Sequence, residues 1–332
     1  MLLLLNDLLR VRNLKTTIQT SAGLVQAVRD VSIDIRAGEI VGLVGESGSG
    51  KTMTALSIIG LLPAPFAKIE SGEIFFEGND LTKLSQEQMQ DVRGKRISMV
   101  FQDSMTALNP TMSAGRQVVE AIQAHLKVSD EEAKAMTIDM FRSVGIPEPE
   151  TRFHQYPFEL SGGMRQRIMI AMALVCKPSL IIADEPTTNL DVSIQAQILE
   201  LLKQIRKDTG SSILLITHNL GVVAWVCDMV YVMYGGEILE GGPVEKILNE
   251  PIHPYTTLLL KSVPRADGER ARLEAIPGDV PNLVSPPKGC VFSPRCPFVV
   301  DKCRSKEPVS ILLDSNHFVR CIMAENQQNK VN

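Results

Sequence analysis

Short apolar runs alternate along this chain with longer segments in which apolar residues recur every three or four positions. The short runs contain few polar residues: 40–44, 97–101, 180–183 and 213–216. Such runs are typical of strands buried on both faces of a parallel sheet. Helical periodicity follows in 53–62 and 192–207. The alternation predicts an α/β fold with a doubly wound sheet that binds ligands at the carboxyl ends of its strands.

Two segments depart from this alternation. Residues 8–36 alternate apolar and polar positions and have turns at 21–23 and 37–38, which predicts an antiparallel edge sheet. From 103 to about 176 the period is helical, and Ser129 followed by acidic residues is typical of a helix N-cap. The sequence therefore predicts a helical subdomain inserted into the α/β frame.

The pattern changes again after Tyr234. A Gly235-Gly236 hairpin and a short helix at 244–249 precede a stretch rich in Pro, Gly and Cys. We therefore expect one domain over 1–250 and a small C-terminal extension over 251–332.

The composition excludes some classes of protein but does not identify the function. The chain has 332 residues, 44% hydrophobic and 22% charged, enough for a buried core and two domains. Its net charge of −4 gives no reason to expect nucleic acid as a partner. The opening leucine run is too short for a signal peptide, and the run 168–176 is about half a membrane span. We expect a cytoplasmic protein that could attach to a membrane partner.

The stretch 45–52, GESGSGKT, joins the strand at 40–44 to the helix at 53–62. It matches the phosphate-binding pattern G-x-x-x-x-G-K-[ST] in the required context of strand, loop and helix. Its glycines let backbone N–H groups and the positive helix end face an anion. Lys51 would reach the β and γ phosphates, and Thr52 would offer a hydroxyl to Mg²⁺. The predicted binding set is Gly45, Glu46, Ser47, Gly48, Ser49, Gly50, Lys51 and Thr52.

Further motifs follow the phosphate loop in a fixed order. They are Gln102 after a strand, LSGGMRQR at 160–167, Asp184-Glu185 with TTNLD at 187–191, and His218. In order and spacing they resemble the Q-loop, signature, Walker B with D-loop, and H-loop of ABC ATPases. The resemblance implies a P-loop ABC ATPase fold that binds ATP and Mg²⁺, with a RecA-like core, an antiparallel β edge sheet and a helical insert.

Each motif has a chemical role that suits its place. Asp184 ends a buried strand and can hold Mg²⁺ together with Thr52 and Gln102, which leaves Glu185 to polarise the attacking water as general base. His218 ends the next strand and could donate to the γ phosphate. A lone histidine is more often structural, but its position favours the catalytic interpretation. The predicted catalytic residues are Glu185, His218 and Gln102.

A second anion site is predicted where Ser161-Gly162-Gly163 opens a helix with uncovered N–H groups. The ABC resemblance implies that this signature closes over the nucleotide of a second ATPase subunit, so that Ser161, Gly162, Gly163 and Asp191 act in trans. Ile18 stands where the family usually stacks an aromatic ring on adenine, so only an apolar contact with the base is expected. Asn189 stands where Ala is common.

The C-terminal motifs narrow the resemblance. These are HPY at 253–255, IPG at 276–278, VP at 280–281 and GCVFSPRCP at 289–297. They look like the extension of the oligopeptide/dipeptide import ATPases. The family implies two ATPase subunits, identical or not, at the cytoplasmic face of the membrane. ATP hydrolysis by these subunits powers transport through two permeases, to which an extracytoplasmic solute-binding protein delivers the solute. Permease contact is expected on 103–125.

The sequence does not identify the transported solute. Di- or oligopeptide import is the leading interpretation, and relatives of the family also move nickel or other small solutes. A soluble ABC ATPase acting on nucleic acid is a different class, disfavoured because the chain has neither a basic patch nor heptads. An ordinary P-loop kinase or GTPase is disfavoured, because residues 161–167 and His218 would have no role in such a protein.

The cysteines divide into two sets. Cys176 and Cys227 lie in apolar helical patterns and are expected to be buried thiols. Cys290, Cys296, Cys303 and Cys321 follow the spacing C-x5-C-x6-C-x17-C, which suggests a metal staple. Disulfides are disfavoured in a reducing cytoplasm, and the spacing does not choose the metal. The resemblance to import ATPases favours a structural [4Fe–4S] cluster over Zn²⁺. His317 is a possible substitute ligand, but a surface histidine is the preferred interpretation.

Overall fold

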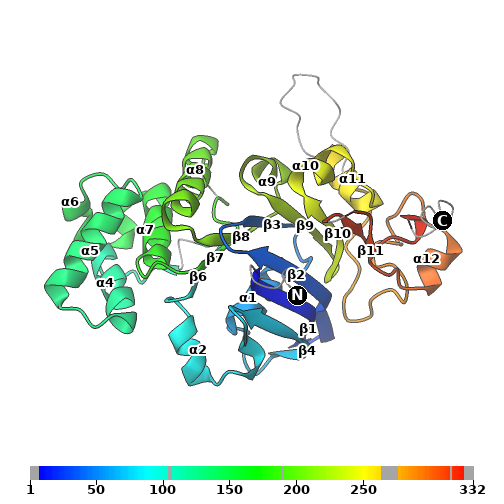
Figure 1. The fold of residues 1–332 in the computed structure, drawn as a ribbon, viewed down its shortest axis with the longest axis horizontal. Helices are drawn as coiled ribbons and strands as arrows, with labels where there is room; N and C mark the ends of the chain where they lie inside the picture. The colour runs from blue at the N-terminus through cyan, green and yellow to red at the C-terminus, as the bar shows by residue number, and fades with distance from the viewer. Residues whose placement is uncertain (1–6, 104–106, 189, 263–275, 315, 325–332) are drawn as a thin grey trace. The chain divides into compact units, whose positions relative to one another are not determined.

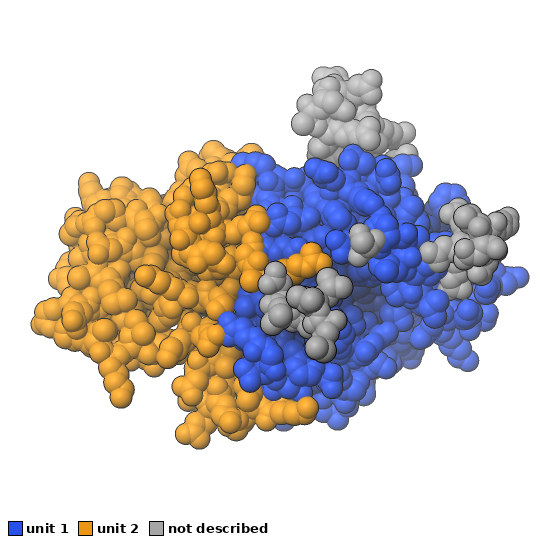
Figure 2. Space-filling model, in the orientation of Figure 1, with its two compact units in different colours: residues 1–35, 39–82, 216–332 blue, residues 36–38, 83–215 orange. Residues whose placement is uncertain are grey.

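The computed structural model describes residues 7–103, 107–188, 190–262, 276–314 and 316–324 (Figure 1). The chain divides into two compact units. The first unit contains residues 1–35, 39–82 and 216–332, and the second contains 36–38 and 83–215 (Figure 2). The opening leucine run and Asn189 lie outside the described residues. Within the described ranges, no helix combines the length and hydrophobicity that crossing a membrane requires.

An antiparallel sheet in the first unit has the strand order β2-β1-β4-β5. Its strands are β1 (Asp7–Thr20), β2 (Gly23–Arg36), β4 (Ala67–Phe76) and β5 (Asn79–Asp80). β1 pairs with β4 from Leu9 opposite Phe76 to Ile18 opposite Ala67, with a bulge near Lys15. This sheet confirms the edge sheet that the sequence predicts over 8–36.

The first unit also contains the strand order β11-β12-β10-β9-β3. The strands are β3 (Ile40–Val44), β9 (Met229–Tyr234), β10 (Glu237–Pro243), β11 (Ile311–Leu312) and β12 (Phe318–Val319). β3 is buried along its whole length and runs parallel to β9. The predicted hairpin between β9 and β10 turns at Gly235 and Gly236, both at positive φ.

The described helices of the first unit lie between its strands along the chain or in the C-terminal extension. They are α1 (Lys51–Ile59), α9 (Leu220–Val226), α10 (Val244–Asn249), α11 (Pro254–Lys261) and α12 (Asp301–Ser305). Tyr234 and Tyr255 share one buried cluster with Val291 and Phe292 from the C-terminal extension. The described part of residues 251–332 therefore shares the first unit's core. The domain boundary expected near 250 stays a prediction.

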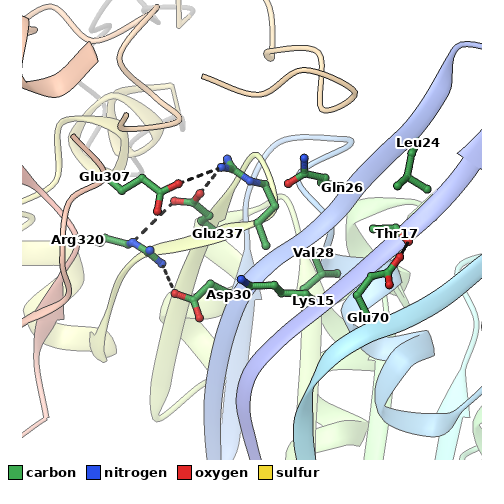
Figure 3. Close-up of a pocket in the computed structure, with 11 residues that line it drawn as sticks. Lys15, Thr17, Leu24, Gln26, Val28, Asp30, Glu70, Glu237, Glu307 and Arg320 are labelled. Atoms are coloured by element: carbon green, nitrogen blue, oxygen red, sulfur yellow. Dashed lines mark hydrogen bonds and ion pairs between the residues drawn. The ribbon is translucent and has the colours of Figure 1, made fainter. Parts of the chain in front are cut away.

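Ion pairs tie the extension to the sheets of the first unit beside a pocket of about 440 Å³ (Figure 3). Arg29 on β2 lies 2.8 Å from Glu237 on β10 and 3.6 Å from Glu307 of the extension. Arg320 lies 3.1 Å from Asp30 and 3.8 Å from Glu237. Burial raises the pKa of the Glu237 carboxyl, and the two guanidinium groups oppose that shift.

The second unit contains the neighbouring strands β8 (Ser212–Thr217), β7 (Leu180–Asp184) and β6 (Ile97–Val100); the last two residues of β8 belong to the first unit. β6 and β7 are parallel, with Ile97 opposite Leu180. The helices α2 (Gln86–Val92) and α8 (Val192–Thr209) complete this α/β part. These buried parallel strands confirm what the apolar runs predict.

The helical insert of the second unit is confirmed (Figure 1). Four helices pack together: α4 (Ala114–His125), α5 (Asp130–Ser143), α6 (Pro149–Phe153) and α7 (Gly162–Leu174). Ser129 caps α5 as expected, because its Oγ accepts from the Glu132 N–H and the Glu132 carboxylate accepts from the Ser129 N–H.

His253 at the N-cap of α11 is buried and neutral. Its Nδ1 accepts a 3.0 Å hydrogen bond from the Tyr255 N–H, and its own N–H donates to Glu240. Burial lowers the pKa of the imidazole from 6.5 to about 3. Below pH 6.5 the unfolded chain therefore binds a proton at His253 that the folded chain does not.

We expect His253 to make folding sensitive to acid. Its contribution to the free energy of unfolding is complete above about pH 6.5 and is lost as the pH falls toward about 3. The variant His253→Asn keeps a capping acceptor, so its free energy of unfolding should depend less steeply on pH. Urea titrations across this window measure the two slopes, with His154→Asn at an exposed histidine as control. Equal slopes for His253→Asn and the native chain would contradict the prediction.

Candidate nucleotide site

The phosphate loop lies between the buried strand β3, which ends at Val44, and α1, which begins at Lys51. Its backbone runs close to other main-chain atoms. A Cβ at Gly45 would lie 2.0 Å from the Met233 carbonyl oxygen, and one at Gly50 would lie 2.4 Å from that of Ala27. Only glycine permits this path, which fixes the loop against β9 and β2.

The loop presents positive groups to an anion. Gly50 caps α1 without a side chain, and the first turn of that helix has no acidic residue. Lys51 is 5% exposed, and its Nζ donates to the carbonyls of Gly45 at 2.8 Å and Glu46 at 2.9 Å. Thr52 is exposed beside it. An ammonium, a helix N-terminus and glycine N–H groups together suit a polyphosphate.

Two more predicted residues belong to the first unit. His218 is exposed immediately after β8, and the Asn219 side chain that follows accepts from the Gly221 N–H at 2.9 Å to begin α9. Ile18 is half-buried on β1, opposite Ala67 on β4.

In the second unit, β7 ends at Asp184, which is 2% exposed, and delivers Glu185 to the carboxyl end of the strand. Glu185 adopts a left-handed φ of +46°, a strained conformation for a residue with a side chain. Its Oε2 accepts from Gln102 Nε2 at 3.1 Å and from Thr188 Oγ1 at 2.9 Å. The structure therefore brings Gln102 and Glu185 together, and holds the carboxylate in one orientation.

Thr188 is a contact that the sequence analysis did not single out. It follows Glu185 in the stretch TTNLD, where two threonines succeed the paired acids. The neighbouring Thr187 hydroxyl accepts from Gln195 Nε2 at 2.9 Å. A pair of hydroxyls so close to a carboxylate at a strand end is the signal that points to these residues.

Ser161 is the N-cap of the signature helix α7. Its Oγ accepts from the Met164 N–H at 3.3 Å, and the side chain is exposed. The first turn of α7 contains no acidic residue. The second predicted anion site therefore has the same helix-end character as the first.

The signature glycines lie against the start of α8. A Cβ at Gly162 would lie 3.7 Å from Leu190, and one at Gly163 would lie 3.0 Å from Ile194. Asp191, exposed at the N-cap of α8, is therefore next to the signature. Close helix packing is one physical reason for glycine here.

The predicted metal centre in the extension is wrong. Among the described residues, no group of three or more His, Cys, Asp or Glu side chains could hold a metal ion. This overturns the [4Fe–4S] cluster on Cys290, Cys296, Cys303 and Cys321, and the Zn²⁺ alternative with it. Sequence spacing shows that thiols are near one another along the chain, but not that they converge on one point.

The extension thiols pack as apolar groups instead. All four are free, so the disulfide alternative is also absent among them. Cys290 and Cys303 belong to the buried cluster around Phe292, whereas Cys321 packs in a smaller cluster with Val319. Burial raises the pKa of Cys290 to about 12, which disfavours the thiolate that a metal needs.

The remaining cysteine and histidine predictions fare differently. Cys176 and Cys227 are half-buried rather than fully buried, and burial raises the pKa of both thiols. His317 is not a surface residue: it is 4% exposed, and its Nε2 lies 2.9 Å from the Glu240 carboxylate. That contact occupies one of the two ring nitrogens.

Known proteins that are similar in sequence to this chain are ATP-binding proteins of peptide transporters. A family model described as "ABC transporter" matches residues 28–188, and one described as "Oligopeptide/dipeptide transporter, C-terminal region" matches 239–303. A dipeptide transport ATP-binding protein, DppD of Bacillus subtilis, is 50% identical over 97% of this chain and 96% of its own length. The oligopeptide transport ATP-binding protein OppD of Salmonella typhimurium is 47% identical over 92% and 90% respectively.

Solved structures of ABC cassettes share the fold. The cassette MJ0796, solved as a dimer bound to ADP and Pi, matches with a TM-score of 0.64 and 26% identity over 71% of this chain and 98% of its own. CbiO1 of Clostridium perfringens, part of the transporter complex cbiONQ, matches with a TM-score of 0.63 and 27% identity over 74% and 92%.

The fold and the motifs define an ATPase of the ABC class, and the P-loop ABC fold predicted from the sequence is confirmed. Within that class, the chain belongs to the family of ABC transporter ATP-binding proteins with an oligopeptide/dipeptide-type C-terminal region.

The crowding at Gly45 leads to a test of the loop. We expect Gly45→Ala to lose more stability than Gly48→Ala, because a Cβ at Gly45 meets a carbonyl whereas one at Gly48 has nothing within 4 Å. Gly48→Ala should cost about 1–2 kcal/mol for its left-handed φ alone. Urea unfolding of both variants measures the difference. Equal losses would mean that close backbone approach does not constrain the loop.

Proposed function

We propose that this chain is the ATP-hydrolysing subunit that powers import of di- or oligopeptides through a membrane permease. The observation that carries the proposal is the match to a dipeptide transport ATP-binding protein at 50% identity over 97% of the chain. A second family model, described as the C-terminal region of oligopeptide/dipeptide transporters, matches residues 239–303 and supports the same substrate class. The proposed place of action is the cytoplasmic face of the membrane, as a peripheral subunit.

The phosphate loop supplies the binding of ATP in this proposal. Its N–H groups and Lys51 hold the triphosphate, while Ile18 gives the base an apolar contact. Thr52, Asp184 and Gln102 would hold Mg²⁺, because side-chain oxygens are the hard donors that this ion prefers. When bound, Mg²⁺ neutralises charge on the β and γ phosphates.

Glu185 is the proposed general base. Its carboxylate is fixed by Gln102 and Thr188, so it can orient a water molecule and accept its proton as the γ phosphate is attacked. His218, exposed after β8, is the proposed donor to the γ phosphate. The left-handed backbone of Glu185 supports its role as general base, because backbone strain of that kind concentrates at functional sites.

A second ATPase subunit completes the proposed site. Ser161, Gly162 and Gly163 at the start of α7 would bind the γ phosphate of the nucleotide held by the partner. Asp191, which follows Leu190 beside Gly162, would also act in trans. The dimeric form of the similar cassette MJ0796 supports such a pairing. Hydrolysis would remove the γ phosphate and release the pair.

Two permease subunits, supplied by an extracytoplasmic solute-binding protein, are the proposed membrane partners. The proposed permease contact is residues 103–125, of which 104–106 lie outside the described residues. An exposed aromatic pair in the same unit supports a docking surface: Phe158 is 71% exposed and stacks on Tyr156 with ring centroids 5.6 Å apart. Exposed apolar groups of this size favour contact with another protein.

The general base has a direct test. Glu185→Gln should still bind ATP, accumulate the ATP-bound closed dimer and stop turnover, because the amide cannot accept the proton from water. Hydrolysis and retained nucleotide are measured on the assembled transporter. Glu200→Gln, an exposed position on α8, is the matched control and should hydrolyse ATP normally. Continued hydrolysis by Glu185→Gln would exclude Glu185 as the base.

The transported solute is tested in cells. Deleting the gene for this chain should abolish uptake of labelled di- or oligopeptides, and the native chain should restore it. Lys51→Ala should not restore it, because the triphosphate loses its charged contact. Uptake of a free amino acid is the control. Unchanged peptide uptake with lost uptake of nickel or another solute would contradict the peptide assignment.

A further inference from the structure

A side chain of the C-terminal extension reaches into the phosphate loop. Arg295 Nη1 lies 2.7 Å from Glu46 Oε2, and its Nη2 lies 3.3 Å from Oε1, which makes a two-pronged ion pair. The arginine side chain is 5% exposed and the glutamate side chain 24%. Solvent therefore screens this pair weakly, unlike a surface salt bridge.

The extension fixes the orientation of Arg295. Its Nε donates to the Pro277 carbonyl at 2.8 Å, and Nη2 also donates to the Ile276 carbonyl at 3.0 Å. The Tyr234 hydroxyl accepts from Nη1 at 3.2 Å, and the guanidinium lies 5.7 Å from that ring's centroid. Contacts to Pro277, Ile276 and Tyr234 thus fix the position in which the guanidinium meets Glu46.

A second contact from the same region holds the backbone of Glu46. Its N–H donates to the Tyr255 hydroxyl at 3.0 Å. Tyr255 is fully buried and packs on Tyr234 and Phe292, with ring centroids 4.7 Å and 5.3 Å away. Burial raises the pKa of this phenol, so the hydroxyl keeps its proton. Residues of the C-terminal part therefore hold both the main chain and the side chain of one loop residue.

Glu46 in turn positions the rest of the loop. Its carbonyl accepts from Lys51 Nζ at 2.9 Å and from the Ser49 N–H at 3.2 Å. Its carboxylate would also repel a bound polyphosphate if it carried an unbalanced charge. Arg295 supplies that balance.

We propose that Arg295 is a positioning residue for nucleotide binding, which couples docking of the C-terminal extension to the affinity of the phosphate loop through Glu46. This inference rests on the proposed ATP site. Loss of Arg295 leaves an unpaired carboxylate in the loop and frees the residue that anchors Lys51. Both effects weaken phosphate binding in the ground state and the transition state alike, so KM should change more than kcat.

The test is a double-variant comparison on the full chain. Arg295→Met should raise the Kd for Mg·ATP and the KM by about tenfold, the loss of one charged hydrogen-bonded pair. Adding Glu46→Gln to that variant removes the unbalanced charge and should recover most of the affinity. Arg304→Met, at an exposed arginine on α12, is the matched control and should bind ATP like the native chain.

Other outcomes overturn the inference. The inference is refuted if Arg295→Met binds ATP as tightly as the native chain. It is also refuted if Arg295→Met loses affinity for ATP and the added Glu46→Gln does not restore it. If Arg295→Met does not fold in a thermal melt, Arg295→Lys decides: it keeps the charge but not the fork, and its Kd should lie above the native value. An unchanged Kd would refute the role. Lys51→Ala separates the two proposals, because equal ATP binding by that variant and the native chain would refute the ATP site itself.

Discussion

The close approach of the phosphate loop to its neighbouring strands is the constraint on which the rest of this structure depends. Carbonyl oxygens of β9 and the adjoining β2 leave no room for a Cβ at Gly45 or Gly50. The loop must therefore be glycine-rich, and its N–H groups stay uncovered for an anion. A loop with uncovered N–H groups at a helix N-terminus is suited to bind phosphate groups.

The chemistry is divided between the two compact units. The first unit holds the phosphate loop and His218, whereas the second holds the Walker B acids, Gln102 and the signature at Ser161. Within the second unit, hydrogen bonds from Gln102 and Thr188 orient the carboxylate of Glu185.

Much of this could be predicted from the sequence because the signals are local. The run 40–44 followed by GESGSGKT predicts strand, loop and helix, since buried parallel strands and glycine turns depend on neighbouring residues alone. The cap at Ser129 is local for the same reason. The sequence also predicted that Gln102 and Glu185 each follow a strand, and these two strands pair in parallel.

Contacts between distant segments could not be predicted in this way. Arg295 and Glu46 are separated by 249 positions, and nothing in either local sequence indicates the other. The cysteines of the extension illustrate the opposite error: four thiols within 32 positions suggested a metal, but Cys290 and Cys303 fill an apolar cluster around Phe292. Convergence of side chains is a property of the packed extension, and spacing along the chain does not contain it.

Competition between inorganic tripolyphosphate and ATP, followed by calorimetry in the presence of Mg²⁺, tests the central claim most directly. If the loop's amides and Lys51 provide the binding energy, tripolyphosphate should displace ATP from the native chain. Lys51→Ala should then bind both ligands at least about tenfold more weakly. Failure of tripolyphosphate to compete, with unchanged ATP affinity in Lys51→Ala, would contradict the account.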